Sequence, residues 1–507
     1  MANPLFDALF APLGARSGPL LHPPDDSSLS CQDFLDLVRR AAAVLLALGV
    51  GTGDRVAAQI DKSPSALALY SATVAVGAVF LPLNTAYTAH EVDYFLTDAA
   101  PAVFVVSPAR ADAFAGRAGM PRHVLTLGAM GEGSFAATPA SLPADWQPTP
   151  RGSDDLAAIL YTSGTTGRSK GAMLTHRNLL SNAETLARLW RFTDRDVLLH
   201  ALPIFHTHGL FVASNISLLT CGQMIFLPGF DPDTVMRLMP KATAMMGVPT
   251  FYTRLLGDPR LTRNAVAHMR LFVSGSAPLL AETHAAFHAR TGHRILERYG
   301  MTETNMSTSN PYDGDRRAGT VGFALPGVDL RITSGGLEVR PGEVGGIEVR
   351  GPNVFKGYWN MPEKTAEELR PDGWFITGDL GRIDADGYLH IVGRAKDLII
   401  TGGFNVYPIE VEEVLDAVPG VAESAVIGLP HPDFGEAVFA VLTLSDPGVT
   451  PDVVLAAIRD RLARFKHPKA AVVIDALPRN AMGKVQKAAL RAQYADRFRT
   501  WPHVKDA

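Results

Sequence analysis

The chain contains 507 residues, which at roughly 150 residues per domain corresponds to about three domain-sized units. Apolar residues make up 47% of it and charged residues only 19%, so the chain can bury a large core and is not a disordered protein. Its 47 Lys and Arg against 51 Asp and Glu give a net charge of −4. That balance argues against nucleic acid or an anionic membrane as the main partner.

The cysteine content and the N-terminus predict a cytoplasmic protein. Cys31 and Cys221 are the only cysteines, too few for a disulfide framework or a four-cysteine zinc site. The first residues lack a basic segment and include Asp7, so no secretory signal is expected. Residues 65–84 and 197–230 are uncharged, but polar residues, glycine and proline interrupt both. We interpret them as buried core segments rather than membrane spans.

The elements predicted for the first 110 residues alternate between helix and strand. Ser30 and Asp33 form a capping pattern that begins the first helix, and Gly49 ends it. Strands are then predicted at residues 54–60, 78–81 and 102–107, and helices at residues 64–76 and 91–97. Such alternation is typical of a mainly parallel sheet covered by helices.

The composition changes along the rest of the chain. Residues 125–153 are predicted to be a surface loop, and residues 320–394 a β-rich sub-unit of short strands joined by glycine turns. The last 110 residues are predicted to be a small α+β unit. Its helices are expected from Pro408 to Val414 and at 451–463, and its strands at 423–427, 437–444 and 470–474.

A dense run of glycine and hydroxyl residues at 161–171 is the sharpest motif. It contains Thr162, Ser163, Gly164, Thr165, Thr166, Gly167 and Lys170. Glycines let the backbone approach an anion, hydroxyls donate hydrogen bonds, and the lysine adds a mobile positive charge. The motif predicts a phosphate-binding loop, although its spacing is not that of a P-loop. An ordinary surface loop is the alternative interpretation.

Three further groups of residues carry possible nucleotide chemistry. They are residues 297–303 with Glu297, Tyr299, Thr302 and Glu303; residues 377–379 and 393–397 with Asp379, Arg394 and Lys396; and residues 478–484 with Lys484. A carboxylate beside a phosphate loop can hold Mg²⁺, an aromatic ring can stack on a purine, and an Asp can accept both ribose hydroxyls. Taken singly, each group also fits an ordinary turn or a solvated surface.

In this order the motifs closely resemble those of the adenylate-forming enzymes, which include acyl-CoA synthetases, luciferases and peptide-synthetase adenylation domains. The resemblance covers residues 30–491. It implies that a carboxylate attacks the α-phosphate of MgATP and that a thiol, usually coenzyme A, then displaces AMP. It also implies an α/β fold with a large N-terminal domain at residues 1–395. A small mobile α+β domain at residues 396–507 would carry Lys484, with Lys396 at the hinge.

The resemblance implies roles for the motif residues. ATP would be bound by Thr162, Ser163, Gly164, Thr165, Thr166, Gly167, Lys170, Gly275, Ser276, Ala277, Glu297, Tyr299, Thr302, Asp379, Arg394 and Lys484. Glu303 would bind Mg²⁺, Thr302 would contact the α-phosphate, and Lys484 would bridge the acid and the α-phosphate. Gly402 and Gly403 would border the coenzyme A tunnel. A lysine acetyltransferase acting on Lys484 is a further hypothesis, because loss of that charge should stop the first step.

Polar residues in the expected acid pocket predict a dicarboxylic acid. Arg254, Ser276 and Arg298 stand where an enzyme for fatty or aromatic acids would carry apolar side chains. A cation there is costly unless it meets an anion, and Arg can bind a second carboxylate in a bidentate manner. Structural ion pairs, with Glu297 or Asp258 for example, are the alternative.

The segments around these residues resemble the malonyl-CoA synthetases. By that resemblance Arg254, Ser276 and Arg298 would bind the distal carboxylate, Thr207 and Met306 would limit what fits at the central carbon, and His206 would line the pocket. His206 and His208, two apart, were expected on one face of a strand, but no third ligand has a matching spacing, so zinc is not expected.

Other functions remain open on the sequence alone. A ligase for methylmalonate, succinate or a short monocarboxylic acid fits the same motifs. An adenylation domain that serves a carrier protein and a non-catalytic nucleotide sensor are the alternatives of other classes. The presence of Lys170, Glu303, Asp379 and Lys484 argues against the sensor.

Overall fold

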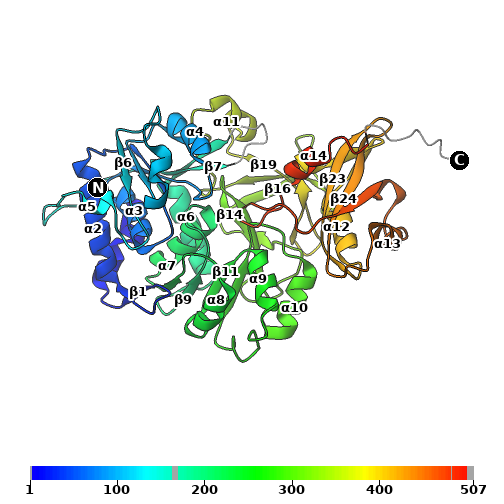
Figure 1. Ribbon diagram of the computed structural model, residues 1–507, viewed down its shortest axis with the longest axis horizontal. Coiled ribbons are helices and arrows are strands. Elements are labelled where there is room, and N and C mark those ends of the chain that lie inside the picture. Colours follow the sequence, from blue (N-terminus) through cyan, green and yellow to red (C-terminus); the bar gives the residue numbers. More distant parts are fainter. Residues whose placement is uncertain (1–2, 163–168, 481, 499–507) are drawn as a thin grey trace. The chain divides into compact units, whose positions relative to one another are not determined.

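The structure is a computed structural model of the 507-residue chain and describes residues 3–162, 169–480 and 482–498. Figure 1 shows its elements coloured along the sequence. They form two compact units, which are described separately. The first unit comprises Met1–Leu330 and Val349–Phe375, and the second comprises Arg331–Glu348 and Ile376–Ala507.

A six-stranded sheet forms one half of the first unit. Its order is β6 (His123–Thr126), β5 (Val103–Val106), β3 (Arg55–Gln59), β4 (Val79–Pro82), β7 (Leu156–Thr162) and β8 (Lys170–Thr175). All pairs are parallel except β7 with β8. Phe95 from a covering helix, Phe104 and Ile159 belong to one buried core cluster at this sheet. The antiparallel β7–β8 pair matters for function, because its connection is the glycine-rich motif.

A nine-stranded sheet forms the other half. Its order is β15 (Phe323–Ala324), β14 (Asn305–Ser309), β13 (Leu296–Met301), β12 (Leu271–Ser274), β11 (Ala244–Gly247), β9 (Val197–His200), β10 (Gln223–Phe226), β1 (Pro19–His22) and β2 (Leu29–Ser30). The six strands from β13 to β1 run parallel. The outer pairs are antiparallel. Tyr252, Phe272 and Phe287 anchor the core beside this sheet.

Helices cover these sheets. In Figure 1, α2, α3 and α4 gather by β6 and β7, and α8, α9 and α10 by β11. The bounds are α1 Pro4–Leu9, η1 Ala11–Ala15, α2 Cys31–Ala47, α3 Pro64–Ala75, α4 Ala89–Ala99, η2 Pro108–Phe114, α5 Ser134–Ala137, α6 His176–Leu189, η3 His208–Ser214, α7 Asn215–Leu219, α8 Pro232–Leu238, η4 Met239–Lys241, α9 Pro249–Leu256, α10 Ala281–Thr291 and α11 Pro362–Glu368. Capping boxes begin α2, α4 and α6, which satisfies backbone N–H groups that a helix leaves unpaired.

The second unit contains two smaller sheets. One has the order β17 (Leu337–Glu338), β16 (Asp329–Ser334), β18 (Gly345–Arg350), β19 (Phe375–Ile383) and β20 (Leu389–Arg394). The other has the order β22 (Phe404–Val406), β21 (Ile399–Thr401), β24 (Gly435–Leu444) and β23 (Val421–His431), with β25 (Ala470–Val473) beside β24. Its helices are η5 Ala395–Asp397, α12 Pro408–Asp416, α13 Pro451–Ala457, η6 Arg464–Lys466 and α14 Lys487–Gln493. Val411, Val426 and Val438 lie in its core.

The predicted α/β fold class is confirmed, and most predicted elements lie within a few residues of the observed ones. Two expectations were wrong in detail. The helix expected at 451–463 ends at Ala457, where Ile458 closes the last turn. His206 and His208 do not lie on a strand: a turn precedes the π-helix η3, which begins at His208.

The predicted boundary after residue 395 stays a prediction. The prediction places a hinge at this position. The division into compact units answers a different question, and it groups the β16–β20 sheet with the C-terminal part of the chain. Both uncharged segments pack inside the first unit as α3–β4 and as β9 to β10. Across the residues that the structure describes, no helix combines the length and the apolar character needed to cross a membrane.

Candidate active site

The phosphate side of the site begins where β7 ends and β8 starts. Thr162 and Lys170 are paired residues in this antiparallel ladder, so they flank the glycine-rich loop. Ser163, Gly164, Thr165, Thr166 and Gly167, all predicted to bind ATP, lie outside the described residues. The ladder therefore fixes both ends of the motif, and Thr162 and Lys170 lie opposite each other at the end of the β7–β8 pair.

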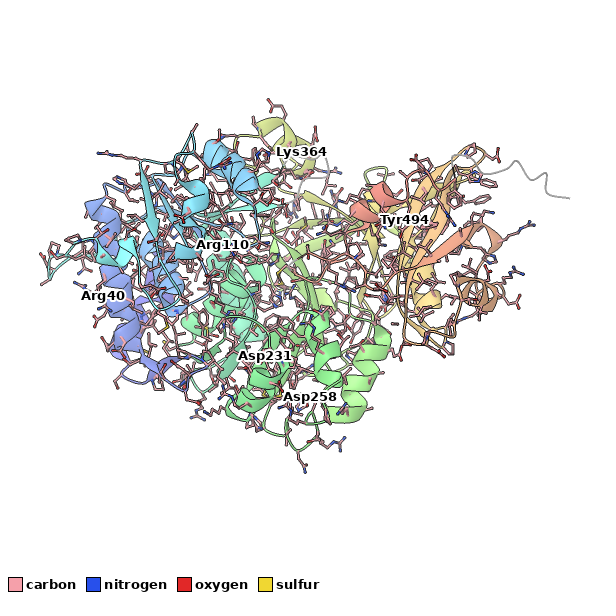
Figure 2. The ribbon with its side chains drawn as sticks, viewed as in Figure 1. Arg40, Arg110, Asp231, Asp258, Lys364 and Tyr494 are labelled. Atoms are coloured by element: carbon pink, nitrogen blue, oxygen red, sulfur yellow. The ribbon has the colours of Figure 1, made fainter. Side chains whose placement is uncertain are left out.

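Lys170 is buried and contacts an acidic and an aromatic residue. Its ammonium lies 3.1 Å from Oε1 of Glu368 and 3.2 Å from the hydroxyl of Tyr358. It also lies 4.3 Å from the centroid of the Tyr358 ring. Glu368 ends α11, the short helix that also carries Lys364, which is labelled in Figure 2. Lys364 contacts the same carboxylate at 3.0 Å.

The hydroxyl of Tyr358 joins Lys170 to the predicted magnesium ligand. It lies 2.6 Å from Oε2 of Glu368 and 3.1 Å from Oε1 of Glu303, and Thr162 approaches the same Glu303 oxygen at 3.5 Å. Burial and the neighbouring carboxylates raise the pKa of Tyr358, so the hydroxyl keeps its proton. Sequence motifs did not identify Tyr358 or Glu368, because both belong to segments without a recognised pattern.

The carboxylate of Glu303 suits a magnesium ion that is bound mainly through a nucleotide. Mg²⁺ prefers oxygen ligands and often takes only one or two carboxylates together with phosphate oxygens and water. Glu303 has the hydroxyls of Thr162 and Tyr358 beside it. Within the described ranges, no three His, Cys, Asp or Glu residues converge as a metal site. The donor set thus fits a single-carboxylate site.

A tight hairpin brings the 297–303 motif to the same region. β13 carries Glu297, Arg298 and Tyr299, and β14 returns beside it with Met306. A side chain at Gly300 would place its Cβ 1.8 Å from the carbonyl oxygen of Asn305, so only glycine allows this approach. The hairpin carries residues that were predicted for the ATP site and for the acid pocket on one strand.

Arg298 is a buried cation with unused hydrogen-bonding groups. It is 3% exposed, and its Nε and Nη2 atoms have no hydrogen-bond partner in the part of the chain that the structure describes. A Cβ at Gly275 would lie 2.4 Å from the guanidinium carbon, so the glycine makes room for it. Burial lowers the pKa of Arg298 to about 9, which leaves it charged at neutral pH.

Ser276 and Thr207, both predicted for the acid pocket, have hydrogen-bond partners of their own. Nδ1 of His208 lies 3.2 Å from the hydroxyl of Ser276, and Thr207 donates to Oδ1 of Asn305 at 2.8 Å. Burial, and next the charge of Arg298, lower the pKa of His206 to about 4 and that of His208 well below its usual value. Both imidazoles are therefore neutral.

Two further buried nitrogen atoms, in His208 and Asn305, lack a hydrogen-bond partner among the described residues. Nδ2 of Asn305 is a donor, whereas the role of Nε2 of His208 depends on the tautomer. Met306, next to Asn305, is 1% exposed. Buried polar atoms are normally hydrogen-bonded, so the unpaired Nδ2 of Asn305 and the unpaired nitrogen atoms of Arg298 can each take an acceptor. The sequence did not predict a role for Asn305, because no feature of the motif distinguishes it from its neighbours.

Arg254 lies apart from this cluster. It is exposed on α9, whose buried residues are Tyr252 and Leu255, and it borders a shallow surface hollow with Asp258 and Arg260. Asp258, labelled in Figure 2, pairs with Arg260 at 2.5 Å. No bond joins Arg254 to Arg298 or Ser276 among the described contacts. Its predicted role in the acid pocket stays a prediction.

Glu297 does not pair with Arg298, its neighbour in the chain. It is 6% exposed and accepts a hydrogen bond from the backbone N–H of Gly319 at 3.3 Å. Burial raises the pKa of Glu297 to about 8, so it is largely neutral at pH 7. Tyr299 is half-buried, and Ser276 has a φ of 72° beside Gly275 and Ala277. Their predicted contacts with adenine stay predictions.

The second unit carries the remaining predicted residues. Asp379 and Arg394 are partners in the β19–β20 ladder, and their side chains pair at 2.6 Å. The carboxylate is thus already held in place by the predicted ribose-binding arginine. Lys396 lies on η5 directly after this ladder and is exposed. Desolvation lowers its pKa.

Lys484 follows a turn that projects it from the second unit. Oδ1 of Asn480 accepts hydrogen bonds from the backbone N–H groups of Met482 and Lys484, and Gly483 has a φ of 73°. Lys484 is exposed as a residue, yet desolvation of its ammonium and then the charge of Arg394 lower its pKa to about 8. Among the described residues it makes no ion pair.

Gly402 and Gly403 form the turn between β21 and β22, with φ values of 56° and 82°. These conformations favour glycine because they lie in the left-handed region. Both glycines are exposed. The turn itself explains the glycine pair, so its predicted role at the coenzyme A tunnel stays a prediction.

The two-part fold and the lysine–carboxylate cluster beside a glycine-rich loop define the class of adenylate-forming enzymes. A family model described as AMP-binding enzyme matches residues 17–359, and one described as AMP-binding enzyme C-terminal domain matches residues 410–484. The chain belongs to the AMP-binding enzyme family. The predicted resemblance to acyl-CoA synthetases is thereby confirmed.

Individual relatives agree with this assignment. The crystal structure of ATP-bound MatB from Rhodopseudomonas palustris is 58% identical, with a TM-score of 0.94 over 98% of this chain and 100% of that chain. Feruloyl-CoA synthase of an Amycolatopsis species is 37% identical over 91% of this chain and 94% of its own. Malonate–CoA ligase of Arabidopsis thaliana is 40% identical over 67% of this chain and 60% of its own.

Proposed function

We propose that the protein ligates malonate to coenzyme A in an ATP-dependent reaction through a malonyl-adenylate, giving malonyl-CoA, AMP and pyrophosphate. The observation that carries the choice of acid is Arg298, a buried guanidinium with two unpartnered nitrogen atoms among the described contacts. Similarity to the malonate–CoA ligase of Arabidopsis thaliana supports the same choice.

The charge of the pocket favours a dianionic acid over a monocarboxylic one. One carboxylate must remain free to attack ATP, so only a second carboxylate can neutralise Arg298. A fatty or aromatic acid would leave the cation unpaired in a desolvated pocket, at a cost of about 2–5 kcal/mol. Nδ2 of Asn305 is a further buried donor without a partner among the described residues. Thr207 and Met306 would then limit the substituent at the central carbon.

The first step needs charge neutralisation and alignment rather than a protein nucleophile. The substrate carboxylate attacks the α-phosphate, and the attacking oxygen and the leaving pyrophosphate stay in line. Lys170 would hold the β- and γ-phosphates, Thr302 would contact the α-phosphate, and Lys484 would bridge it to the acid. Mg²⁺ held by Glu303 would supply further positive charge at the phosphates.

Further residues are proposed to bind the nucleoside. Asp379, oriented by Arg394 at 2.6 Å, would accept the ribose hydroxyls. Tyr299 and the backbone of residues 275–277 would contact adenine. In the second step the thiol of coenzyme A displaces AMP, with Gly402 and Gly403 beside the pantetheine arm and Lys396 as the hinge between the half-reactions.

Pyrophosphate release over a panel of acids, with and without coenzyme A, tests the proposal. Malonate should exceed acetate, succinate and a fatty acid in kcat/KM, and release should be faster with coenzyme A. A clear preference for acetate or a fatty acid would contradict the role of Arg298. Methylmalonate is the alternative substrate that the panel must include. Binding of ATP without any turnover would favour the sensor.

A carrier-protein partner and acetylation are separate questions. Transfer to a carrier in trans would be detected if a phosphopantetheinylated carrier replaced coenzyme A in the same assay. Acetylation of Lys484 by a lysine acetyltransferase stays a prediction; mass spectrometry of protein from cells that always shows Lys484 unmodified would count against it.

A further inference from the structure

Lys62 is a lysine in the interior of the first unit that the proposed mechanism does not use. It lies between β3 and α3 and is 9% exposed. Its ammonium nitrogen lies 2.8 Å from Nδ1 of His200, 2.7 Å from the carbonyl oxygen of His200 and 2.9 Å from the carbonyl oxygen of Leu202. The ring of Phe226 is centred 4.3 Å away. No carboxylate pairs with Lys62 among the described residues.

The three acceptors match the three N–H groups of a charged ammonium. Burial lowers the pKa of Lys62, and the acceptors oppose that shift because they bond best to the protonated form. Nε2 of His200 lies 2.9 Å from the carbonyl oxygen of Gly209 and 3.1 Å from the hydroxyl of Ser214. His200 is therefore a neutral imidazole that accepts from Lys62 at Nδ1 and donates to Gly209 at Nε2.

These bonds enclose the segment that lines the acid pocket. Lys62 binds the start of the segment at Leu202, and His200 binds its end at Gly209. Residues 202–209 between these points carry His206, Thr207 and His208. The two ends also touch, because a Cβ at Gly209 would lie 2.0 Å from the carbonyl oxygen of Pro203. The π-helix η3 begins within the segment at His208, and such local irregularities are often found at functional sites.

We propose that Lys62 is a positioning residue for acid binding, acting through Leu202 and His200 on residues 202–209. The proposal rests on the proposed function, because that function places this segment in the acid pocket. Lys62 does not touch the acid. It fixes the position from which Thr207 reaches Asn305 and His208 reaches Ser276. A displacement of about 1 Å at such contacts can cost on the order of 100-fold in rate.

Lys62→Met, which keeps the length of the side chain and removes the ammonium, tests this role. The expected result is a rise of about 10-fold or more in the KM for malonate, a changed malonate-to-methylmalonate ratio, and an ATP KM within about twofold of wild type. Arg270→Met is the matched control, because Arg270 is also a largely buried cation but pairs with Asp196 at 2.6 Å. It should lower Tm without changing acid selectivity.

Unchanged acid KM and selectivity in Lys62→Met, or equal changes in the KM values for acid and ATP, would overturn the proposal. If Lys62→Met does not fold, Lys62→Arg decides, because it keeps the charge but redirects the N–H groups. It should raise the acid KM by at least about threefold, and an unchanged value would overturn the role. If the wild-type protein prefers an acid other than malonate, the substrate proposal is wrong. The change that Lys62→Met causes in the KM for the preferred acid then still tests the role of Lys62.

Discussion

The proposed acid pocket and the proposed phosphate side of the first unit differ in whether their buried cation has an ion-pair partner. On the phosphate side Lys170 already holds a carboxylate, Glu368, at 3.1 Å. In the acid pocket the guanidinium of Arg298 is more deeply buried, yet two of its nitrogen atoms have no partner among the described residues. An ion-pair partner within the protein offsets much of the desolvation cost of a buried cation. A buried cation without such a partner lowers the stability of the ligand-free protein.

This difference indicates which pocket discriminates between substrates. A ligand that reaches Lys170 must replace or share an existing ion pair, so the gain in binding free energy is partly offset. A ligand that reaches Arg298 relieves an unsatisfied charge, so the correct acid is favoured over an acid without a second carboxylate. The second unit repeats the paired arrangement, with Asp379 and Arg394 at 2.6 Å.

Lys484 also makes no ion pair among the described residues, and its removal should have the largest effect. Lys484→Ala should reduce adenylation by about 10³-fold, because a charge aimed at the reacting groups stabilises the transition state more than the ground state. Thioester formation from supplied malonyl-adenylate should remain largely intact. Pyrophosphate release and thioester formation are measured separately.

Lys487→Ala is the control for this variant, because Lys487 pairs with Glu412 at 2.6 Å and should leave both half-reactions nearly unchanged. Equal losses in the two half-reactions of Lys484→Ala would contradict its role in the first step alone.

The comparison requires that Glu297 is not the missing counter-ion of Arg298. Its pKa is about 8 in the folded protein against an ordinary value of 4.5. Between these values the folded state holds a proton that the unfolded state has lost, so the free energy of unfolding should fall as pH rises from about 4.5 to 8. At about 1.36 kcal/mol per unit, the cost at pH 7 is on the order of 3 kcal/mol.

Glu297→Gln should remove this slope and stabilise the protein at pH 7 and above. Urea unfolding at several pH values measures it, with the exposed Glu282→Gln on α10 as the control. A loss of stability in Glu297→Gln at pH 7 would show that Glu297 is ionised and paired, and the contrast between the two pockets would not hold.

Arg298→Met tests the unpaired cation directly. The variant should lower kcat/KM for malonate by about 10²-fold, the lower part of the range for losing one partner of a desolvated charge pair, while ATP binding survives. Because the variant removes unsatisfied buried groups, Tm should rise. Arg331→Met is the opposite case, since it would remove the arginine that pairs at 2.6 Å with the buried carboxylate of Glu348, and Tm should fall. A fall in Tm with unchanged malonate kinetics would assign Arg298 to structure.

The sequence predicted the parts of this molecule that depend on local pattern. Helix caps such as Ser30 with Asp33 and the alternating elements depend on residues close together in the chain, and the structure places them where the local pattern predicts. The position of Asp379 opposite Arg394 also follows from two motifs at the facing ends of one hairpin.

The rest depends on contacts between distant segments, which a single sequence does not reveal. Tyr358 and Glu368 reach Lys170 from almost 200 positions away, and Lys62 meets His200 across 138 positions. The pairing state of Arg298 could not be predicted either, because it is decided by what surrounds the guanidinium in three dimensions.

Glu368→Gln tests the paired side of the comparison, and we expect the smallest effect there. The amide keeps the shape of Glu368 but removes the negative charge that pairs with Lys170. The phosphates of ATP then no longer compete with this carboxylate for the ammonium of Lys170. The ATP KM should fall about threefold, with the malonate KM unchanged and the difference smaller at high salt.

Glu367→Gln on the same helix is the matched control, because Glu367 contacts Lys364 at 2.6 Å and has no contact with Lys170 among the described residues. A rise in the ATP KM of Glu368→Gln would mean that the carboxylate orients Lys170 for phosphate rather than competing with it. The phosphate side would then need its acid partner for binding, and Arg298 would differ from Lys170 in having its partner supplied by the substrate.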